Sequence, residues 1–223
     1  MNIEIQPSSG PEEIAAHIEQ MIFDGHLPPG EKVREIALAD HLGIGRAPVR
    51  EAIRLLEGRR LLVRTRNAGV AVASLSLDDF EQLLITREAL EGMAARYAAE
   101  NMTLAQIGEL RTVAQKMEQA EKEASNQADV FVTRADSDFH RSIALGSRNH
   151  WISNLLCNDL YALLKLMRFR SASLRPKPLD AHAEHQAIID CIQQRDPEGA
   201  ERLMREHIRQ SRLRLISHLR SSC

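Results

Sequence analysis

The sequence predicts a mainly α-helical chain with two unlike parts: three short helices and a β-hairpin over residues 1–75, then an all-helical bundle of six or seven helices over 76–223. Three observations predict this division. Strand-forming runs end at residue 73, basic residues concentrate in the first third of the chain, and helix-capping patterns recur from Ser76 onward. The length of 223 residues also accommodates two domains.

The first part shows helically spaced apolar residues followed by two short β-prone runs. The predicted elements, in chain order, are a helix over 12–24, a helix from Glu35 to Gly43, a helix from there to Gly58, and strands over 61–65 and 70–73. Arg66, Asn67 and Gly69 belong to the tight turn that joins the two strands. Helices that meet at a glycine and lead into a hairpin predict a winged helix-turn-helix.

The second part shows helix signals alone. Thr103 and Gln106 form a capping box, and Asp196-Pro197 combines a capping residue with a proline that suits the first helical position. Six helices are predicted, near 77–100, 104–124, 128–146, 150–170, 179–195 and 197–219. We therefore expect an all-α domain.

The charge distribution predicts a DNA-binding first part. Residues 32–66 contain nine Lys or Arg and four Asp or Glu, so this segment carries +5 and the rest of the chain −7. Arg46 and Arg50 share one face of the third helix, and Arg54 follows one turn later. In a helix-turn-helix the second helix enters the major groove, where an arginine can bind guanine. Plain solvated charge is the competing interpretation.

A longer motif supports this interpretation. Residues 38–56, LADHLGIGRAPVREAIRLL, resemble the signature of the GntR superfamily. The resemblance implies a winged-helix repressor or activator that binds a pseudo-palindromic operator as a homodimer. It also implies that Arg46 and Arg50 contact the operator and that Gly69 lies at the wing tip, in the minor groove. Arg34 and Arg66 are further candidates for phosphate contacts.

Polar residues recur on apolar faces of the second part. Asp136 and His140 lie one helical turn apart, so both side chains can bind one ion or simply bond each other. His185 lies ten residues before Arg195, and His207 lies ten residues after Pro197. Because a tight turn joins the last two helices, both histidines should lie at one height. Each alone is typical of a core histidine, but together they can hold a divalent transition metal.

This spacing resembles the metal-binding subset of the FadR C-terminal domain, called FCD. The resemblance implies a bundle whose interior metal, bound by Asp136, His140, His185 and His207, helps to hold a small carboxylate effector. Zinc is the first expectation, and nickel or manganese also fit such ligands. Arg87, in the run Arg-Glu-Ala-Leu-Glu, and Asn149 match the family's effector-binding pattern. For Arg87, an ion pair with Glu91 is an equal alternative.

The expected function is transcriptional repression relieved or changed by the effector, without enzymatic activity. Two alternatives stay open: a metal-dependent hydrolase, although no general-base motif is evident, and a regulator whose metal is purely structural. No apolar run approaches the ~20 residues that span a bilayer, and the first residues do not form a signal peptide. We therefore expect a cytoplasmic protein without a membrane partner.

Overall fold

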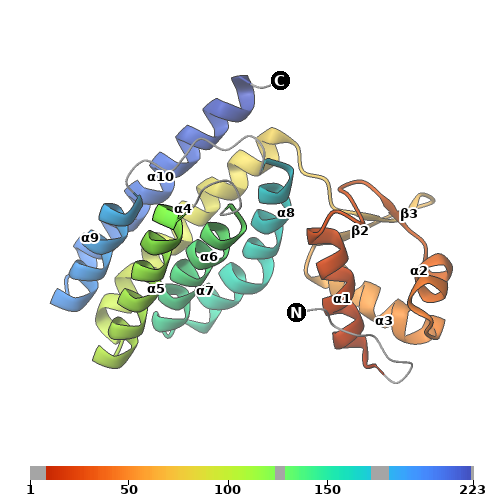
Figure 1. Ribbon diagram of the computed structural model, residues 1–223, viewed down its shortest axis with the longest axis horizontal. Helices are drawn as coiled ribbons and strands as arrows, with labels where there is room; N and C mark the ends of the chain where they lie inside the picture. Colours follow the sequence, from red (N-terminus) through yellow and green to blue (C-terminus); the bar gives the residue numbers. More distant parts are fainter. Residues whose placement is uncertain (1–8, 124–128, 172–180, 222–223) are drawn as a thin grey trace. The chain divides into compact units, whose positions relative to one another are not determined.

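The computed structural model describes residues 9–123, 129–171 and 181–221, and the side chains of all of these except 120–123, 129–137, 159 and 167–171. The chain forms two compact units (Figure 1). The first comprises Met1–Ser76 and Ala162–Arg170, and the second comprises Leu77–Tyr161 and Ser171–Cys223.

The first unit contains the three expected helices and the expected hairpin. Its elements are α1 (Pro11–Phe23), β1 (Lys32–Val33), α2 (Glu35–Leu42), α3 (Arg46–Gly58), β2 (Leu62–Thr65) and β3 (Gly69–Val72). The strand β1 was not predicted, because two residues are too few to show an alternating pattern. It pairs antiparallel with β3, so the sheet has the order β1-β3-β2.

Apolar side chains from all three helices and the hairpin close the core of this unit. The fully buried ones include Ile14, Ile18, Ile22, Val49, Ile53, Leu56 and Leu61. The turn between α2 and α3 depends on Gly43, whose φ of 66° lies in the left-handed region. Glycine adopts this conformation without a steric penalty, which lets the chain turn from α2 into α3 within three residues.

The second unit is entirely helical in its described residues. Its helices are α4 (Leu77–Asn101), α5 (Leu104–Glu123), α6 (Asp129–Gly146), α7 (His150–Asn154), η1 (Leu155–Leu160), α8 (Tyr161–Ser171, of which 162–170 belong to the first unit), α9 (Ala181–Gln194) and α10 (Pro197–Ser221). The helix predicted over 150–170 is thus one continuous stretch with a π-helical segment in its middle. Periodicity alone does not reveal this segment, because its six residues are too few to show a changed apolar spacing.

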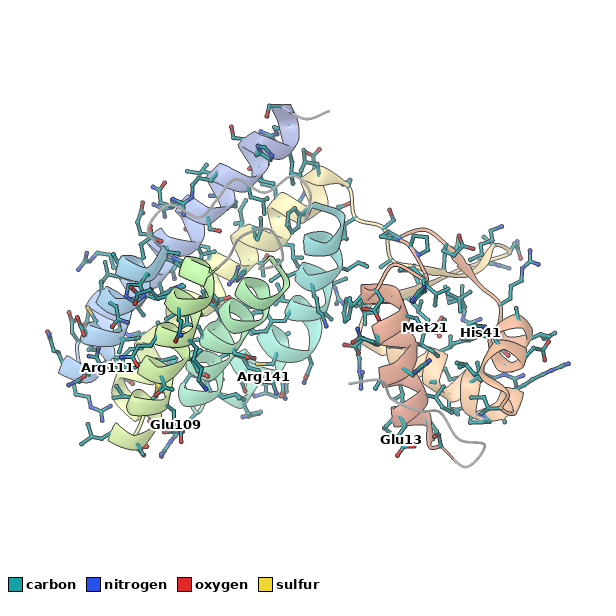
Figure 2. The ribbon with its side chains drawn as sticks, viewed as in Figure 1. Glu13, Met21, His41, Glu109, Arg111 and Arg141 are labelled. Atoms are coloured by element: carbon teal, nitrogen blue, oxygen red, sulfur yellow. The ribbon has the colours of Figure 1, made fainter. Side chains whose placement is uncertain are left out.

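The core of the second unit lies between α4, α5, α6, α9 and α10, with α4 packed along α10 (Figure 1). Both predicted caps are present. Thr103 and Gln106 exchange hydrogen bonds at the start of α5, and Asp196 accepts from the Gly199 N–H at the start of α10. On the surface, Arg111 of α5, labelled in Figure 2, donates to Gln186, Asp190 and Gln193 of α9.

Within the described ranges, no helix combines the length and the apolar character that crossing a membrane requires. Cys157 and Cys191 are free thiols, in agreement with their scattered positions in the sequence.

Candidate DNA-reading face and metal centre

The helix α3 presents a row of arginines to solvent. Its apolar face, which includes Val49 and Ile53, is fully buried in the first unit. Because residues four apart share a helix face, Arg46, Arg50 and Arg54 form one exposed row along α3. The α-helix begins after Gly45 without a side-chain cap, so its first N–H groups are also open to an anion.

Two of these arginines hold acidic neighbours. Arg50 Nε donates to Glu35 Oε2 at 3.0 Å, and this ion pair joins α3 to the start of α2. Arg54 bonds Glu51 at 2.8 Å within α3. The Arg50 and Arg54 side chains remain 51% and 62% exposed, so both pairs are surface pairs that contribute about 0–1 kcal/mol. Such pairs can open to engage phosphate or a base edge.

The wing has the backbone that its turn residues predict. Asn67 and Gly69 adopt φ values of 64° and 88°, in the left-handed region, and Arg66 and Asn67 are exposed at the tip. Arg34 is exposed at the N-cap of α2. Two other basic residues have structural roles, since Arg59 pairs with Glu19 of α1 and Arg64 pairs with Glu57.

A surface hollow of about 1300 Å³ lies between α1 and α2 in the first unit. Its walls include Met21, Arg34 and His41, of which Met21 and His41 are labelled in Figure 2. Sequence periodicity did not predict this hollow, because its walls combine residues of α1, of α2 and of the segment between them.

Three buried histidines meet inside the second unit. His140 of α6, His185 of α9 and His207 of α10 each offer one ring nitrogen, and these atoms lie within 4.8 Å of one another. His185 Nε2 is 3.2 Å from His207 Nε2, so the two histidines do lie at one height, as their equal distances from the turn predict. The rings are 1–6% exposed.

Carboxylates hold two of the three rings. His140 Nδ1 lies 2.5 Å from Glu91 Oε2, and His207 Nδ1 lies 2.6 Å from Glu184 Oε2. A hydrogen bond to His207 lowers the pKa of Glu184 below its ordinary value. His182, one turn before His185, instead pairs with Glu118 at 3.1 Å and lies outside the three-histidine group.

Glu91 is the centre of a buried polar cluster. Besides His140, it bonds Arg87 one turn earlier on α4, and it accepts a hydrogen bond from Tyr161 Oη at 3.3 Å. Burial acts to raise the pKa of Glu91, but Arg87 and His140 outweigh it and lower this pKa from 4.5 to about 2. Burial, reinforced by the charge of Glu91, raises the pKa of Tyr161 well above 10. Glu91 is therefore an anion and Tyr161 a neutral donor at neutral pH.

Three other predicted site residues of the second unit are Asp136, Arg87 and Asn149. Position 136 is on α6, but the Asp136 side chain lies outside the described side chains. Arg87 forms an ion pair with Glu91, which was the alternative interpretation of this residue. Glu91 in turn contacts His140 of the histidine group. Asn149 is the N-cap of α7, where its side-chain oxygen accepts from the Ile152 N–H at 3.2 Å.

Glu91, Glu184 and Tyr161 were not predicted as site residues. The sequence indicates Glu91 only as a partner of Arg87, because the two residues are one helical turn apart. The contacts of Glu184 and Tyr161 join different helices, so no local spacing could indicate them. A buried, apolar-sided histidine does imply some polar partner, because an unsatisfied imidazole in a core is costly.

The donor set fits a divalent transition metal. Neutral imidazoles are good ligands for zinc and nickel, and the histidines of such sites usually donate their second N–H to a carboxylate. His207 has that hydrogen bond with Glu184 here, and His140 Nδ1 lies at ion-pair distance from Glu91. Three protein ligands would leave coordination positions for Asp136 or for an exogenous oxygen ligand.

Family models match both units. The model of bacterial regulatory proteins of the gntR family matches residues 11–72, and the FCD domain model matches residues 82–210. The second match covers more than half of the chain.

The chain belongs to the GntR family of bacterial regulators with an FCD domain.

Curated relatives of this GntR-family chain agree with that assignment. A "Probable D-xylose utilization operon transcriptional repressor" of Paenarthrobacter nicotinovorans is 33% identical over 199 residues, 88% of this chain and 84% of the relative. The "Glc operon transcriptional activator" of Escherichia coli K12 is 27% identical over 221 residues, 89% of this chain and 85% of the relative. Both activators and repressors therefore occur among the relatives.

A solved structure shares the fold. Escherichia coli McbR/YncC superimposes with a TM-score of 0.75 at 21% identity, covering 94% of this chain and 98% of that one. The domains and the relatives are transcriptional regulators and not enzymes, so this GntR-family protein is a transcriptional regulator and the hydrolase alternative is set aside.

Proposed function

We propose that this regulator binds a pseudo-palindromic operator as a homodimer and represses transcription, with residues 1–75 as the DNA-binding domain and 76–223 as the dimerisation and effector domain. The exposed arginine row of α3 is the observation that supports operator reading. Arg46, Arg50 and Arg54 enter the major groove, where an arginine fork can bind guanine O6 and N7. Arg34 and Arg66 contact phosphates, and Asn67 and Gly69 bring the wing to the minor groove.

The second unit, in this proposal, holds a divalent metal ion through His140, His185 and His207, with Asp136 as the fourth ligand. The single observation that supports it is the buried three-histidine group with its two carboxylate partners. Zinc is the metal we propose first, followed by nickel and manganese. The bound ion supplies an open position to a small carboxylate metabolite, and Arg87 and Asn149 border the same effector site.

A second version of this function has a purely structural metal. The ion pair between Arg87 and Glu91 favours it, because the charge of Arg87 is already balanced inside the protein. In that version, removing the metal lowers the melting temperature and leaves the affinity for carboxylates unchanged. In the first version, both fall together.

A native mass spectrum of gently purified protein tests the assembly. A dimer with one metal ion per chain, with or without the extra mass of an organic acid, is the expected result. A metal-free monomer would contradict both the dimer and the metal site.

Selection of bound sequences from a random DNA pool tests the reader and yields an operator for titration. We expect a two-fold symmetric motif whose half-sites are about one helical turn apart. The affinity for that motif should then respond to acetate, malonate or citrate in the zinc-loaded protein, and not in a His185→Ala/His207→Ala variant. An equal response in both proteins would refute the coupling between metal site and DNA binding.

A further inference from the structure

Two histidines of the cluster lie with their Nδ1 atoms against carboxylates from neighbouring helices. His140 on α6 has its Nδ1 2.5 Å from Glu91 Oε2 on α4. His207 on α10 has its Nδ1 2.6 Å from Glu184 Oε2 on α9. The two pairs use four different helices, so helix spacing does not produce them.

A carboxylate at Nδ1 determines what the opposite ring nitrogen can do. An ionised carboxylate only accepts hydrogen bonds, so in the neutral ring Nδ1 carries the proton and Nε2 carries the lone pair. For His207 that lone pair faces His185, since the two Nε2 atoms are 3.2 Å apart. In the neutral ring, a carboxylate at Nδ1 thus leaves Nε2, the nitrogen that a metal binds, without a proton.

We propose that Glu91 and Glu184 are positioning residues of the metal centre, which orient His140 and His207 so that their Nε2 atoms converge on one ion. This inference rests on the proposed metal function and adds to it the residues that set ring orientation. A carboxylate in this position also raises the basicity of the ligand, and the loss of such a partner typically costs 10–100-fold in metal affinity.

Glu184 is the better position for a test. Glu91 is 2% exposed and also holds Arg87 and Tyr161, so its replacement would disturb the fold. The Glu184 side chain is 32% exposed and bonds His207 near the rim of the site. Its truncation removes one ring partner and leaves the buried cluster around Glu91 in place.

The chain provides a matched control. His182 Nε2 pairs with Glu118 Oε2 at 3.1 Å, and the Glu118 side chain is 31% exposed, nearly the same as that of Glu184. His182 lies on α9, one turn from His185, but outside the three-histidine group. Glu118→Ala therefore removes a histidine–carboxylate pair of similar exposure, between α5 and α9, without touching a proposed ligand.

The experiment titrates the full-length, metal-stripped protein with Co²⁺ against a chromophoric chelator and records the visible absorption of the bound ion. We expect Glu184→Ala to weaken Co²⁺ binding about 10–100-fold and to change the band positions and intensities. Glu184→Gln should recover part of this loss, because its amide oxygen can still accept a hydrogen bond from the Nδ1–H of His207. Glu118→Ala should match the wild type, and all metal-free proteins should melt at similar temperatures.

Three outcomes would overturn the inference. Unchanged Co²⁺ affinity and spectrum in Glu184→Ala would show that the carboxylate merely satisfies a core histidine. An equal loss in Glu118→Ala would show that the effect is not specific to the site. No Co²⁺ binding by the wild type would refute the proposed metal centre itself, and the positioning role with it.

Discussion

The arginine row of α3 and the polar cluster around Glu91 contain similar residues in opposite environments. Arg50 pairs with Glu35 across two helices and keeps half of its surface in water. Arg87 pairs with Glu91 within one helix, and both side chains are at most 5% exposed. In water an ion pair can be exchanged for a phosphate at little cost, whereas a buried pair cannot lose one partner without leaving a desolvated charge.

The exposed arginines of α3 and the buried polar groups around Glu91 differ in what they contribute to the protein. The arginine row of α3 is exposed, so its contribution to the fold is small and its charge is available to a partner. In the second unit Arg87, Glu91 and the three imidazoles are buried, so each of these polar groups needs a partner inside the protein. Substitutions in the two regions should therefore differ in what they damage.

The largest effect should follow from breaking the buried pair. Glu91→Ala leaves the Arg87 charge without its carboxylate, so we expect the free energy of unfolding of the helical unit to fall by about 3–5 kcal/mol. Urea unfolding followed by circular dichroism measures it. Arg87→Met/Glu91→Leu, which removes both charges and keeps apolar volume, should recover part of the loss, because His140 and Tyr161 still lose their carboxylate. If Glu91→Ala were as mild as Glu35→Ala, the contrast between buried and surface pairs would be wrong.

Metal loading should give the next effect. A ligand that binds only the folded state adds about 2.7 kcal/mol of stability at a free concentration of one hundred times its Kd. Zinc should accordingly raise the melting temperature of the wild-type protein and leave that of His207→Ala unchanged. Mg²⁺, which prefers oxygen ligands, serves as the control and should have no effect. A zinc-induced shift that persists in His207→Ala would place the ion elsewhere.

Substitutions in the arginine row of α3 should show the reverse pattern, with a large effect on operator affinity and a small effect on the free energy of unfolding. Arg50→Ala should weaken operator binding by about 1–3 kcal/mol, because a bidentate contact to a base is lost. Its free energy of unfolding should change by no more than about 1 kcal/mol, the worth of its surface pair with Glu35. Fluorescence anisotropy with labelled operator and urea unfolding measure the two quantities.

An exposed arginine of the second unit is the control for that measurement. Arg141, labelled on α6 in Figure 2, is also solvent-exposed, and Arg141→Ala should leave operator affinity unchanged. Equal losses in Arg50→Ala and Arg141→Ala would indicate a general charge effect and contradict base reading.

The smallest predicted effect concerns alkaline stability. The pKa of Tyr161 is raised above 10 in the folded protein, so its hydroxyl ionises first in the unfolded chain as the pH rises. Stability conferred by the protonated hydroxyl is complete below pH 10 and is lost as the pH climbs toward the folded pKa, by up to about 1.4 kcal/mol per pH unit. Tyr161→Phe removes this contribution, so urea unfolding between pH 9 and 11 should show a shallower decline. Equal slopes in both proteins would contradict the burial of that hydroxyl.

Local pattern determined much of this molecule. The sequence alone predicted the capping box at Thr103, the glycine turn after α2 and the buried face of α3. Each of these features depends only on neighbours within one or two helical turns. The sequence also predicted that His185 and His207 lie close together, since two helices joined by a tight turn run antiparallel.

Only the tertiary structure decided the remaining contacts. The pairing of His140 with Glu91, of His207 with Glu184 and of Tyr161 with Glu91 joins residues on different helices, and the π-helical segment before Tyr161 shifts its register. Spacing places a side chain on a face of its own helix, but the partner it meets depends on the packing of every helix around it. That is why the histidines could be predicted from the sequence, and the carboxylates that hold them could not.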